Sequence, residues 1–417
     1  MHLPPIDRST LEARIATMAG YGKVGETGVT RTVFSPEWVA ANDQLAAWMG
    51  EAGLNVRMDA AGNLWGRIEG SDNRGSIVSG SHVDSQAPGG RFDGVLGIIA
   101  ALTSVESLVR ELGPPRRTLE VVSLCEEEGS RFPTAGFWGS RAILGLITPD
   151  DVENTVSFTG EKIGDVMRSV GLDPTELPAA VRNDIDAFIE LHIEQGPILE
   201  SEGLPVGIVT GITGYRHFDV TIRGTANHAG AFPMDLRRDP MAAAAEIISG
   251  VINTAHRMGR PAVTTVGRIT ADPNYPAIVP DSVRFTIDAR HPDAEQRDLL
   301  YARHTALIQE VGERRNVDVE MTFTKDLGPR PCDPEIVQLL AAAAGDLGIP
   351  HRLLPSGAVH DTQRFSEIAR TAMIFVQSRD GRSHTPNEFT ETEHAALGIE
   401  VLREGLRRLA YGDDTHG

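Results

Sequence analysis

The chain has 417 residues, of which 41% are hydrophobic and 23% are charged, and it carries a formal net charge of −19. This length allows two or three domains with a large buried core. The acidic balance argues against binding to nucleic acid, because nothing would offset the repulsion from the phosphates.

Two further features of the sequence bear on its compartment. No apolar run approaches the roughly 18 residues of a membrane span, and the first residues lack the pattern of a secretory signal. The two cysteines, Cys125 and Cys332, are too few for a disulfide framework. We therefore expect a cytoplasmic protein that uses no membrane and keeps both thiols buried and reduced.

The first part of the chain predicts a sheet that is covered by helices. We expect a helix over residues 35–53, because Ser, Pro and Glu stand at its start and Gly at its end. Strand, helix and strand follow at 75–81, 94–112 and 117–125, and another strand at 186–193. Because these segments are apolar nearly throughout, they predict an α/β sandwich with helices on both faces of the sheet.

The pattern changes near residue 211. A β-α-β-β-α-β order follows, which is the ferredoxin-like arrangement, at 216–224, 239–258, 262–270, 282–290, 293–315 and 317–326. A helix at 333–348, a buried strand at 371–377 and a closing amphipathic helix at 391–411 return to the first domain. We therefore expect one domain made of 1–211 and 327–417, with a second domain, 212–326, inserted into it.

Histidines and carboxylates come directly after the apolar strands, where α/β sheets place their active sites. Taken singly, His82 could be an ordinary loop histidine, and the run Glu126–Glu128 a solvated face or a helix start. Taken together, three adjacent acidic side chains behind a buried strand would repel one another unless a cation lies beside them. Imidazole and carboxylate without thiolate favour Zn²⁺ or Mn²⁺, with Co²⁺ and Ni²⁺ as alternatives. The donors are His82, Asp84, Asp93, Glu126–Glu128, His192, Glu194 and His384.

Five motifs that occur in order carry a resemblance to a known family. They are GSHVDSQAPGGRFDGVLG, EEEGSRFPTAGFWGSRAILG, LHIEQGPILE, GTANHAGAFPMDLRRDP and GRSHTPNEFT. With the N-terminal GVTRTVFSPEW they resemble the amidase/hydantoinase/carbamoylase branch of the M20 di-metal peptidase family. The resemblance implies a di-metal exopeptidase-like α/β/α catalytic domain with an inserted ferredoxin-like lid and dimerisation domain.

The resemblance also implies roles for the donors at the strand ends. His82 and His192 would be ligands on opposite metals, Asp93 would bridge the two ions, and Glu128 and His384 would complete the ligand set. Glu127 would be the general base on a bridging water, and Asp84 would support the imidazole of His82. Glu126 stands at a position where the family varies, and we expect it to be solvated.

At the substrate end, the resemblance points to residues of both domains. His228 would stabilise the oxyanion from the other subunit of a homodimer, and Arg290 would hold a substrate carboxylate in bidentate fashion. Gln195 would contact the substrate amide, and Gly357 and Ala358 belong to a substrate loop.

Two positions depart from the family pattern. Val359 replaces a glycine of the substrate loop, and Ala277 replaces an asparagine that contacts the substrate carboxylate end. Asn274 is a candidate substitute for that asparagine.

The predicted function is metal-dependent hydrolysis of a linear C–N bond in a small N-carbamoyl or N-acyl amino acid or ureide that carries a carboxylate. One alternative is an aminoacylase-like or dipeptidase-like hydrolase of an ordinary amide. Another is a binding protein that has kept the fold and lost the chemistry.

Overall fold

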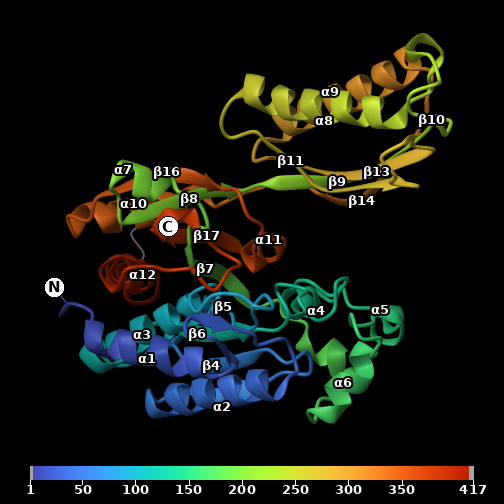
Figure 1. Ribbon diagram of the computed structural model, residues 1–417. Helices are drawn as coiled ribbons and strands as arrows, with labels where there is room; N and C mark the ends of the chain where they lie inside the picture. The colour runs from blue at the N-terminus through green and yellow to red at the C-terminus, as the bar shows by residue number, and fades with distance from the viewer. Residues whose placement is uncertain (1–2, 413–417) are drawn as a thin grey trace. The chain divides into compact units, whose positions relative to one another are not determined.

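The computed structural model describes residues 3–412, and Figure 1 labels its helices and strands. The described chain divides into two compact units. Unit 1 comprises residues 3–210, 332–354 and 360–412, and unit 2 comprises Gly211–Pro331 and Pro355–Val359. The assignment of 212–326 as a lid and dimerisation domain stays a prediction.

Unit 1 contains most of the helices and a large mixed sheet. The helices are α1 (Arg8–Gly20), α2 (Pro36–Glu51), α3 (Val95–Leu112), α4 (Trp138–Ile143), α5 (Pro149–Asn154), α6 (Ile163–Ser169), α7 (Ile198–Glu202), α10 (Pro334–Asp346), α11 (Asp361–Phe365) and α12 (Thr392–Tyr411), with 3₁₀ turns η1 (Pro174–Ala180) and η3 (Arg379–Gly381). The strands are β1 (Lys23–Val24), β2 (Gly28–Val29), β3 (Asn55–Met58), β4 (Leu64–Ile68), β5 (Asp72–His82), β6 (Arg117–Leu124), β7 (Ile185–Ile193), β8 (Val206–Ile212), β16 (His351–Ser356) and β17 (Arg370–Val376).

The centre of the sheet is parallel and its margins are antiparallel. The strand order is β15-β8-β17-β7-β5-β6-β4-β3, where β15 is Arg330–Pro331, and β16 also pairs with β8. Strands β17, β7, β5 and β6 run parallel to one another, whereas β8, β4 and β3 join antiparallel. The carboxyl ends of the four parallel strands therefore meet at one edge of the sheet.

Helices cover both faces of this sheet, as predicted. Helices α3 and α12 pack against each other and against the parallel strands (Figure 1). The close contact depends on Gly97 of α3, where a Cβ would lie only 2.7 Å from the Cβ of Ser81. Because side chains alternate along a strand, Val78 of β5 faces the other side, where it joins a buried cluster with Ile143 of α4 and Phe365 of α11. The predicted α/β fold is confirmed.

Unit 2 is an antiparallel sheet with two helices on one face (Figure 1). The chain follows the order β9 (Gly214–Arg223), α8 (Pro240–Met258), β11 (Val263–Asp272), β13 (Ser282–His291), α9 (Ala294–Arg314) and β14 (Asp318–Leu327), and the sheet order is β11-β13-β9-β14. A small ladder joins β10 (Asn227–His228) to β12 (Ile278–Val279), β15 is Arg330–Pro331, and η2 is Met234–Leu236. Alternate residues of β9, such as Phe218 and Val220, form the core under the helices.

A buried histidine makes the stability of unit 2 sensitive to acid. His304 of α9 is fully buried, and its Nε2 lies 2.9 Å from Oγ1 of Thr264. Burial lowers the pKa of His304 from 6.5 to about 4. The imidazole of His304 therefore binds a proton below pH 6.5 in the unfolded chain, but only below about pH 4 in the folded unit.

We expect unit 2 to lose about 3 kcal/mol of stability as the pH falls from 6.5 to 4. The free energy of urea-induced unfolding, measured across this range, checks the prediction. His304→Gln removes the titrating ring, so its unfolding free energy should depend less on pH. An identical pH dependence in both proteins would contradict this account.

Among residues 3–412, no helix has the length and apolar character needed to cross a membrane.

Candidate metal centre and active site

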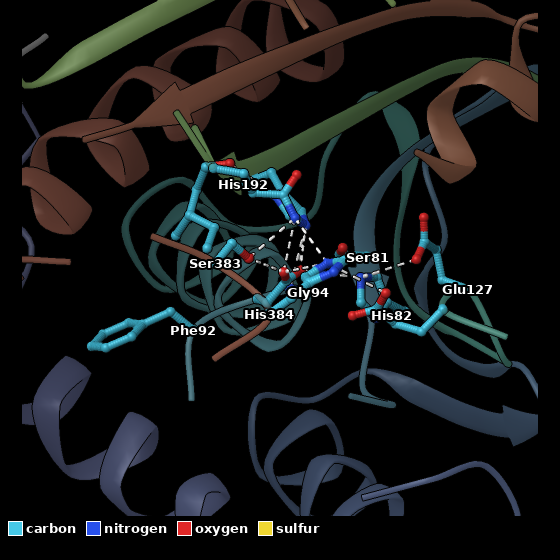
Figure 2. A network of polar contacts seen from close by, with 12 residues as sticks. Ser81, His82, Phe92, Gly94, Glu127, His192, Ser383 and His384 are labelled. Atoms are coloured by element: carbon cyan, nitrogen blue, oxygen red, sulfur yellow. Dashed lines mark hydrogen bonds and ion pairs between the residues drawn. The ribbon is translucent and has the colours of Figure 1, made fainter. Parts of the chain in front are cut away.

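The four parallel strands bring the predicted donors to one edge of the sheet. His82 ends β5, the glutamates follow β6, His192 lies near the end of β7, and His384 follows β17. Figure 2 shows the side chains of His82, His192 and His384 pointing toward one another, with Glu127 beside His82. The register explains this convergence, since His82 pairs with Leu124 and His192 with Phe375.

Asp93 is the centre of this group. Its Oδ1 lies 3.1 Å from Nε2 of His192 and 3.6 Å from Nε2 of His82. Its Oδ2 lies 3.4 Å from Nε2 of His384, which is in turn 3.5 Å from Oε2 of Glu128. Each carboxylate oxygen of Asp93 therefore faces a different pair of donors, which is the arrangement of a bridging ligand.

This grouping differs from the expectation that His82 and His192 serve opposite metals. His82, Asp93 and His192 form one set of donor atoms that lie within 4.8 Å of one another, and Asp93, Glu128 and His384 form a second set. The physical reason is that β5 and β7 are neighbours in the sheet, so their terminal histidines approach the same oxygen of Asp93.

A glycine allows the ring of His82 to lie against the start of α3. Gly94 has φ of 65°, and a Cβ at this position would lie 2.4 Å from Cε1 of His82. Any side chain at residue 94 would displace the imidazole, so the turn between Asp93 and α3 requires glycine.

Asp84 supports the site in a different way from the expected one. The Nδ1 of His82 lies 3.0 Å from the backbone oxygen of Asp84, and the carboxylate is farther away, at 3.7 Å. The buried carboxylate instead accepts hydrogen bonds from the backbone amides of Glu127, at 3.3 Å, and Glu128, at 3.1 Å. Asp84 therefore fixes both the imidazole and the two glutamates in one place.

The charged groups of the site shift one another's pKa values. Burial raises the pKa of the Asp93 carboxyl, but the adjacent His192, His384 and His82 more than offset this and hold it well below its ordinary value. Burial lowers the pKa of His82, and Asp93 and Glu127 reverse this and hold it well above 6.5. The pKa of His384 is raised to about 9, because Asp93 and Glu128 outweigh its burial.

The two glutamates that follow Glu126 are also perturbed. Burial raises the pKa of Glu127 well above 4.5, and the charge of Glu128 adds to this although His82 opposes it. Burial and the charge of Asp93 likewise raise the pKa of Glu128. Such crowding of carboxylates is relieved when a cation is shared among them.

The donor set fits divalent metal ions. Imidazole nitrogens and carboxylate oxygens are the ligands that Zn²⁺ and Mn²⁺ accept. The Oε1 of Glu128 is buried and has no hydrogen-bond partner within residues 3–412, which leaves it free to bind an ion. His82, Asp93, Glu128, His192 and His384 would hold the metal.

The prediction that Glu126 is solvated is wrong, because its side chain is buried. Its exposure is 0%, and its Oε1 accepts a hydrogen bond from the amide of Phe132 at 3.1 Å. The left-handed backbone of Glu126, with φ of 52°, accompanies a side chain directed into the protein. Burial and the charge of Asp84 raise the pKa of Glu126 well above 4.5.

Two residues near His384 were missed by sequence reasoning. Oε1 of Glu388 accepts the backbone amides of Phe92 and Asp93, at 2.8 and 3.0 Å. Ser383 donates its hydroxyl to Oδ2 of Asp93 at 2.6 Å. Glu388 is buried, and burial together with the charge of Asp93 raises its pKa to about 7. A carboxylate four residues after a candidate histidine ligand was the signal available in the sequence.

Gln195 lies at the same edge of the sheet. Its Nε2 donates to Oδ2 of Asp93 at 2.8 Å, and its buried Oε1 has no hydrogen-bond partner in the described chain. Like Glu126, Gln195 and His384 have positive φ, of 57° and 56°. Such conformations cost about 1–3 kcal/mol each and cluster at functional sites.

Arg31, which sequence reasoning also missed, is a buried cation behind the loop of His82. Its exposure is 1%, and its Nε donates to the carbonyl of Val83 at 2.6 Å. Its Nη1 donates to the carbonyls of Met18 and Tyr21, at the end of α1. Burial lowers the pKa of Arg31 to about 10, against the attraction of Asp84. Arg31 therefore ties the turn between His82 and Asp84 to α1.

We expect Arg31→Met to weaken metal binding by about tenfold or more, because the turn that carries His82 loses its anchor. Titration of the folded variant against a chelator of known affinity measures this. Arg403→Met is the matched control, since Arg403 is a buried arginine that donates to Pro4 and Ser107 instead. Equal metal affinities of the two folded variants would contradict the assigned role.

The other predicted residues lie in unit 2. His228 of β10 is exposed, and its Nδ1 accepts the backbone amides of Gly230 and Ala231, at 3.1 and 3.0 Å. Residue 278 pairs with His228, and the carbonyl of Ala277 accepts the amide of Ala229 at 3.0 Å. The departure at Ala277 is therefore adjacent to His228 in the fold.

Arg290, Gly357 and Ala358 also belong to unit 2. Arg290 donates to both carboxylate oxygens of Asp288, and its Nη1 donates to the carbonyl of Gly357 at 3.0 Å. The amide of Ala358 donates to Oγ of Ser356 at 3.1 Å. Asn274 is exposed and has φ of 53°.

A cluster of histidines and carboxylates around a shared aspartate, at the carboxyl edge of an α/β sheet, defines a metal-dependent hydrolase. Residues 79–408 match the family described as Peptidase family M20/M25/M40, and the chain belongs to this family, as the resemblance predicted.

Relatives match the chain over nearly its whole length. It is 41% identical over 411 residues to an N-carbamoyl-L-amino acid amidohydrolase of Geobacillus stearothermophilus, covering 98% of this chain and 100% of that protein. It is 38% identical over 406 residues to an allantoate amidohydrolase of Escherichia coli, covering 97% and 98%. A solved amidase of the hydantoinase/carbamoylase family from Burkholderia multivorans superposes with a TM-score of 0.90 at 32% identity, covering 96% of this chain and 97% of that one.

Proposed function

We propose that the protein hydrolyses a linear C–N bond of a small N-carbamoyl or N-acyl amino acid or ureide, using two divalent metal ions. The observation that carries the proposal is the pair of donor sets that share Asp93, with the carboxylate of Glu127 beside them. The names of the full-length relatives support the carbamoyl and ureide substrate class.

Glu127 is the proposed general base. Its Oε2 lies 3.9 Å from Nε2 of His82, and its backbone is held by Asp84 on one side and Phe137 on the other. When bound, the two ions supply an acidified water and polarise the substrate carbonyl. Glu127 takes a proton from the attacking water and delivers it to the leaving nitrogen.

The hydrogen bonds of His228 support its role as an oxyanion donor. Because Nδ1 accepts two backbone amides, the proton of the neutral ring must lie on Nε2. The exposed edge of the ring is therefore a hydrogen-bond donor. A donor of this kind stabilises the negative oxygen that forms when water adds to a carbonyl.

Recognition of the substrate carboxylate is proposed for Arg290. Asp288 accepts from Nε and Nη2 and the carbonyl of Gly357 accepts from Nη1, so one N–H group on each terminal nitrogen is left for a ligand. Gln195 would contact the amide or carbamoyl group through its free Oε1. Ala277 brings no side-chain donor next to His228, so the carboxylate end has fewer hydrogen bonds than the family pattern supplies.

We further propose that the active protein is a homodimer in which His228 serves the partner's site. The segment around His228 exposes large apolar side chains, as expected of a surface that a second copy covers. These side chains are Met234 (74% exposed), Leu236 (63%), Tyr275 (65%) and Ile278 (36%). The two free, buried cysteines agree with a cytoplasmic location.

A substrate panel tests the reaction. The enzyme, loaded with Zn²⁺ or Mn²⁺, is supplied with N-carbamoyl, N-formyl and N-acyl amino acids and with allantoate, and ammonia and amine are measured separately. Release of ammonia from carbamoyl or ureide substrates supports the proposal. Cleavage of ordinary amides alone would favour an aminoacylase-like or dipeptidase-like enzyme, and turnover of none of these compounds would overturn the proposal.

A mixing experiment tests the shared site. His228→Ala and Glu127→Ala are each expected to be inactive, and mixed dimers should regain part of the activity, because one of their two sites has both residues. Native mass spectrometry follows the exchange of subunits. Proven exchange without recovered activity would overturn the shared site.

A further inference from the structure

The face of the unit 2 sheet opposite α8 and α9 carries a cavity that polar and charged residues largely line. Its volume is about 740 Å³, and all its lining residues belong to unit 2. They include His217, Arg268, Thr286, Asp288, Arg290 and Gly357. The side chains that point to this face are polar because the alternate residues of the same strands, such as Phe218 and Ile287, form the core under the helices.

The ion pairs on this face leave one arginine largely free. Asp219 forms a close pair with Arg284, at 2.6 and 2.7 Å. Arg268 reaches the same carboxylate only at 3.4 Å, and its side chain is 59% exposed. Arg268 therefore brings a positive charge to the cavity wall whose nearest carboxylate is already bound by another arginine.

Arg290 is the second cation of the cavity. Asp288 accepts from it at 2.8 and 2.9 Å and also lies 2.8 Å from Nε2 of His217. Because the carbonyl of Gly357 accepts from Nη1, Arg290 keeps one N–H group on each terminal nitrogen for a ligand. The charged residues that line the cavity are Arg268, Arg290, Asp219 and Asp288, and Asp219 is bound mainly by Arg284, which is not a lining residue.

The register of the sheet sets the distance between the two cations. Arg268 pairs with Thr286, which lies four residues before Arg290 on β13 and on the same face. The two arginines therefore start from positions about 13 Å apart along the strand. The guanidinium of Arg290 is held by Asp288 and Gly357, and the long, exposed side chain of Arg268 can close much of this gap, so one small molecule can meet both guanidinium groups.

We propose that this cavity selects substrates with a second anionic group: Arg290 binds the α-carboxylate, and Arg268 binds a carboxylate on the amino-acid side chain. The inference rests on the proposed function and adds a substrate class to it, the N-carbamoyl or N-acyl derivatives of acidic amino acids. Thr286, which pairs with Arg268 and lines the cavity, offers a hydroxyl to the bound molecule.

The test compares two substrates that differ only in charge. N-carbamoylglutamate and N-carbamoylglutamine, each as both enantiomers, are supplied to the metal-loaded enzyme. We expect kcat/KM to favour the glutamate compound. In Arg268→Gln this preference should fall about tenfold or more, as expected for loss of one charged hydrogen bond, while kcat/KM for the glutamine compound stays unchanged.

Arg223→Gln is the matched control. Arg223 lies at the opposite end of β9 from His217 and pairs with Glu320, so its loss changes the net charge equally without altering the cavity. Equal turnover of the two compounds by the parent enzyme, or an unchanged preference in Arg268→Gln, would overturn this inference and leave the proposed function standing. Turnover of neither compound, nor of any other member of the panel, would overturn both.

Discussion

Glu127→Gln is expected to lower kcat by about 10²–10⁴-fold while metal content stays at the parent level. The amide keeps the size of the side chain and removes its ability to accept a proton. The backbone of residue 127 is held by Asp84 and by the amide of Phe137, so the substitution should not move the loop. Steady-state kinetics together with metal analysis of the same sample measure both quantities.

The neighbouring glutamate provides the control for this experiment. Glu126 is more deeply buried than Glu127, but its Oε1 accepts the amide of Phe132, which a glutamine oxygen can also do. Glu126→Gln should therefore retain most of the activity. A Glu127→Gln variant that binds metal and turns over at the parent rate would show that another group accepts the proton.

Asp93→Ala is expected to abolish activity and to remove both metal ions, whereas His192→Ala should remove only one. Asp93 belongs to both donor sets, the one with His82 and the one with His384. Of these two sets, His192 belongs only to the one with His82. Loss of the shared carboxylate leaves each set with only two of its three donors. Metal content after gel filtration, measured by mass spectrometry and expressed per chain, distinguishes the two variants.

Asp59→Asn is the control for loss of a buried carboxylate. Asp59 accepts hydrogen bonds from Ala61, Asn63 and Trp65, and no donor set includes it. We expect this variant to be less stable but to keep the metal content of the parent. Equal metal content in Asp93→Ala and the parent protein would contradict the role of Asp93 as a shared metal ligand.

The strands and the residues at their ends could be predicted from the sequence, because apolar runs followed by histidine or carboxylate have a direct meaning in an α/β sheet. The pairing of His82 with His192 could not be predicted this way. It depends on which strands are neighbours, and strand order is set by packing of the whole sheet.

The supporting residues were harder to find for a related reason. Arg31 and Glu388 act on backbone groups of Val83, Phe92 and Asp93, which lie far from them in sequence. A charged residue in a loop gives no sign of burial until the fold brings other segments over it. Glu126 shows the same limit, since its burial follows from a left-handed backbone and the later loop at Phe132.

The interrupted course of unit 1 has a consequence for how the enzyme matures on the ribosome. The chain that supplies His82, Asp93, Glu128 and His192 is made first, but His384 and β17 come only after the main segment of unit 2. Unit 2 can therefore begin to fold during translation, before β17, the last parallel strand of the unit 1 sheet, has been made. The second donor set, Asp93, Glu128 and His384, is then completed only when His384 has been made, so a chain truncated before residue 384 lacks one of the three donors of this set.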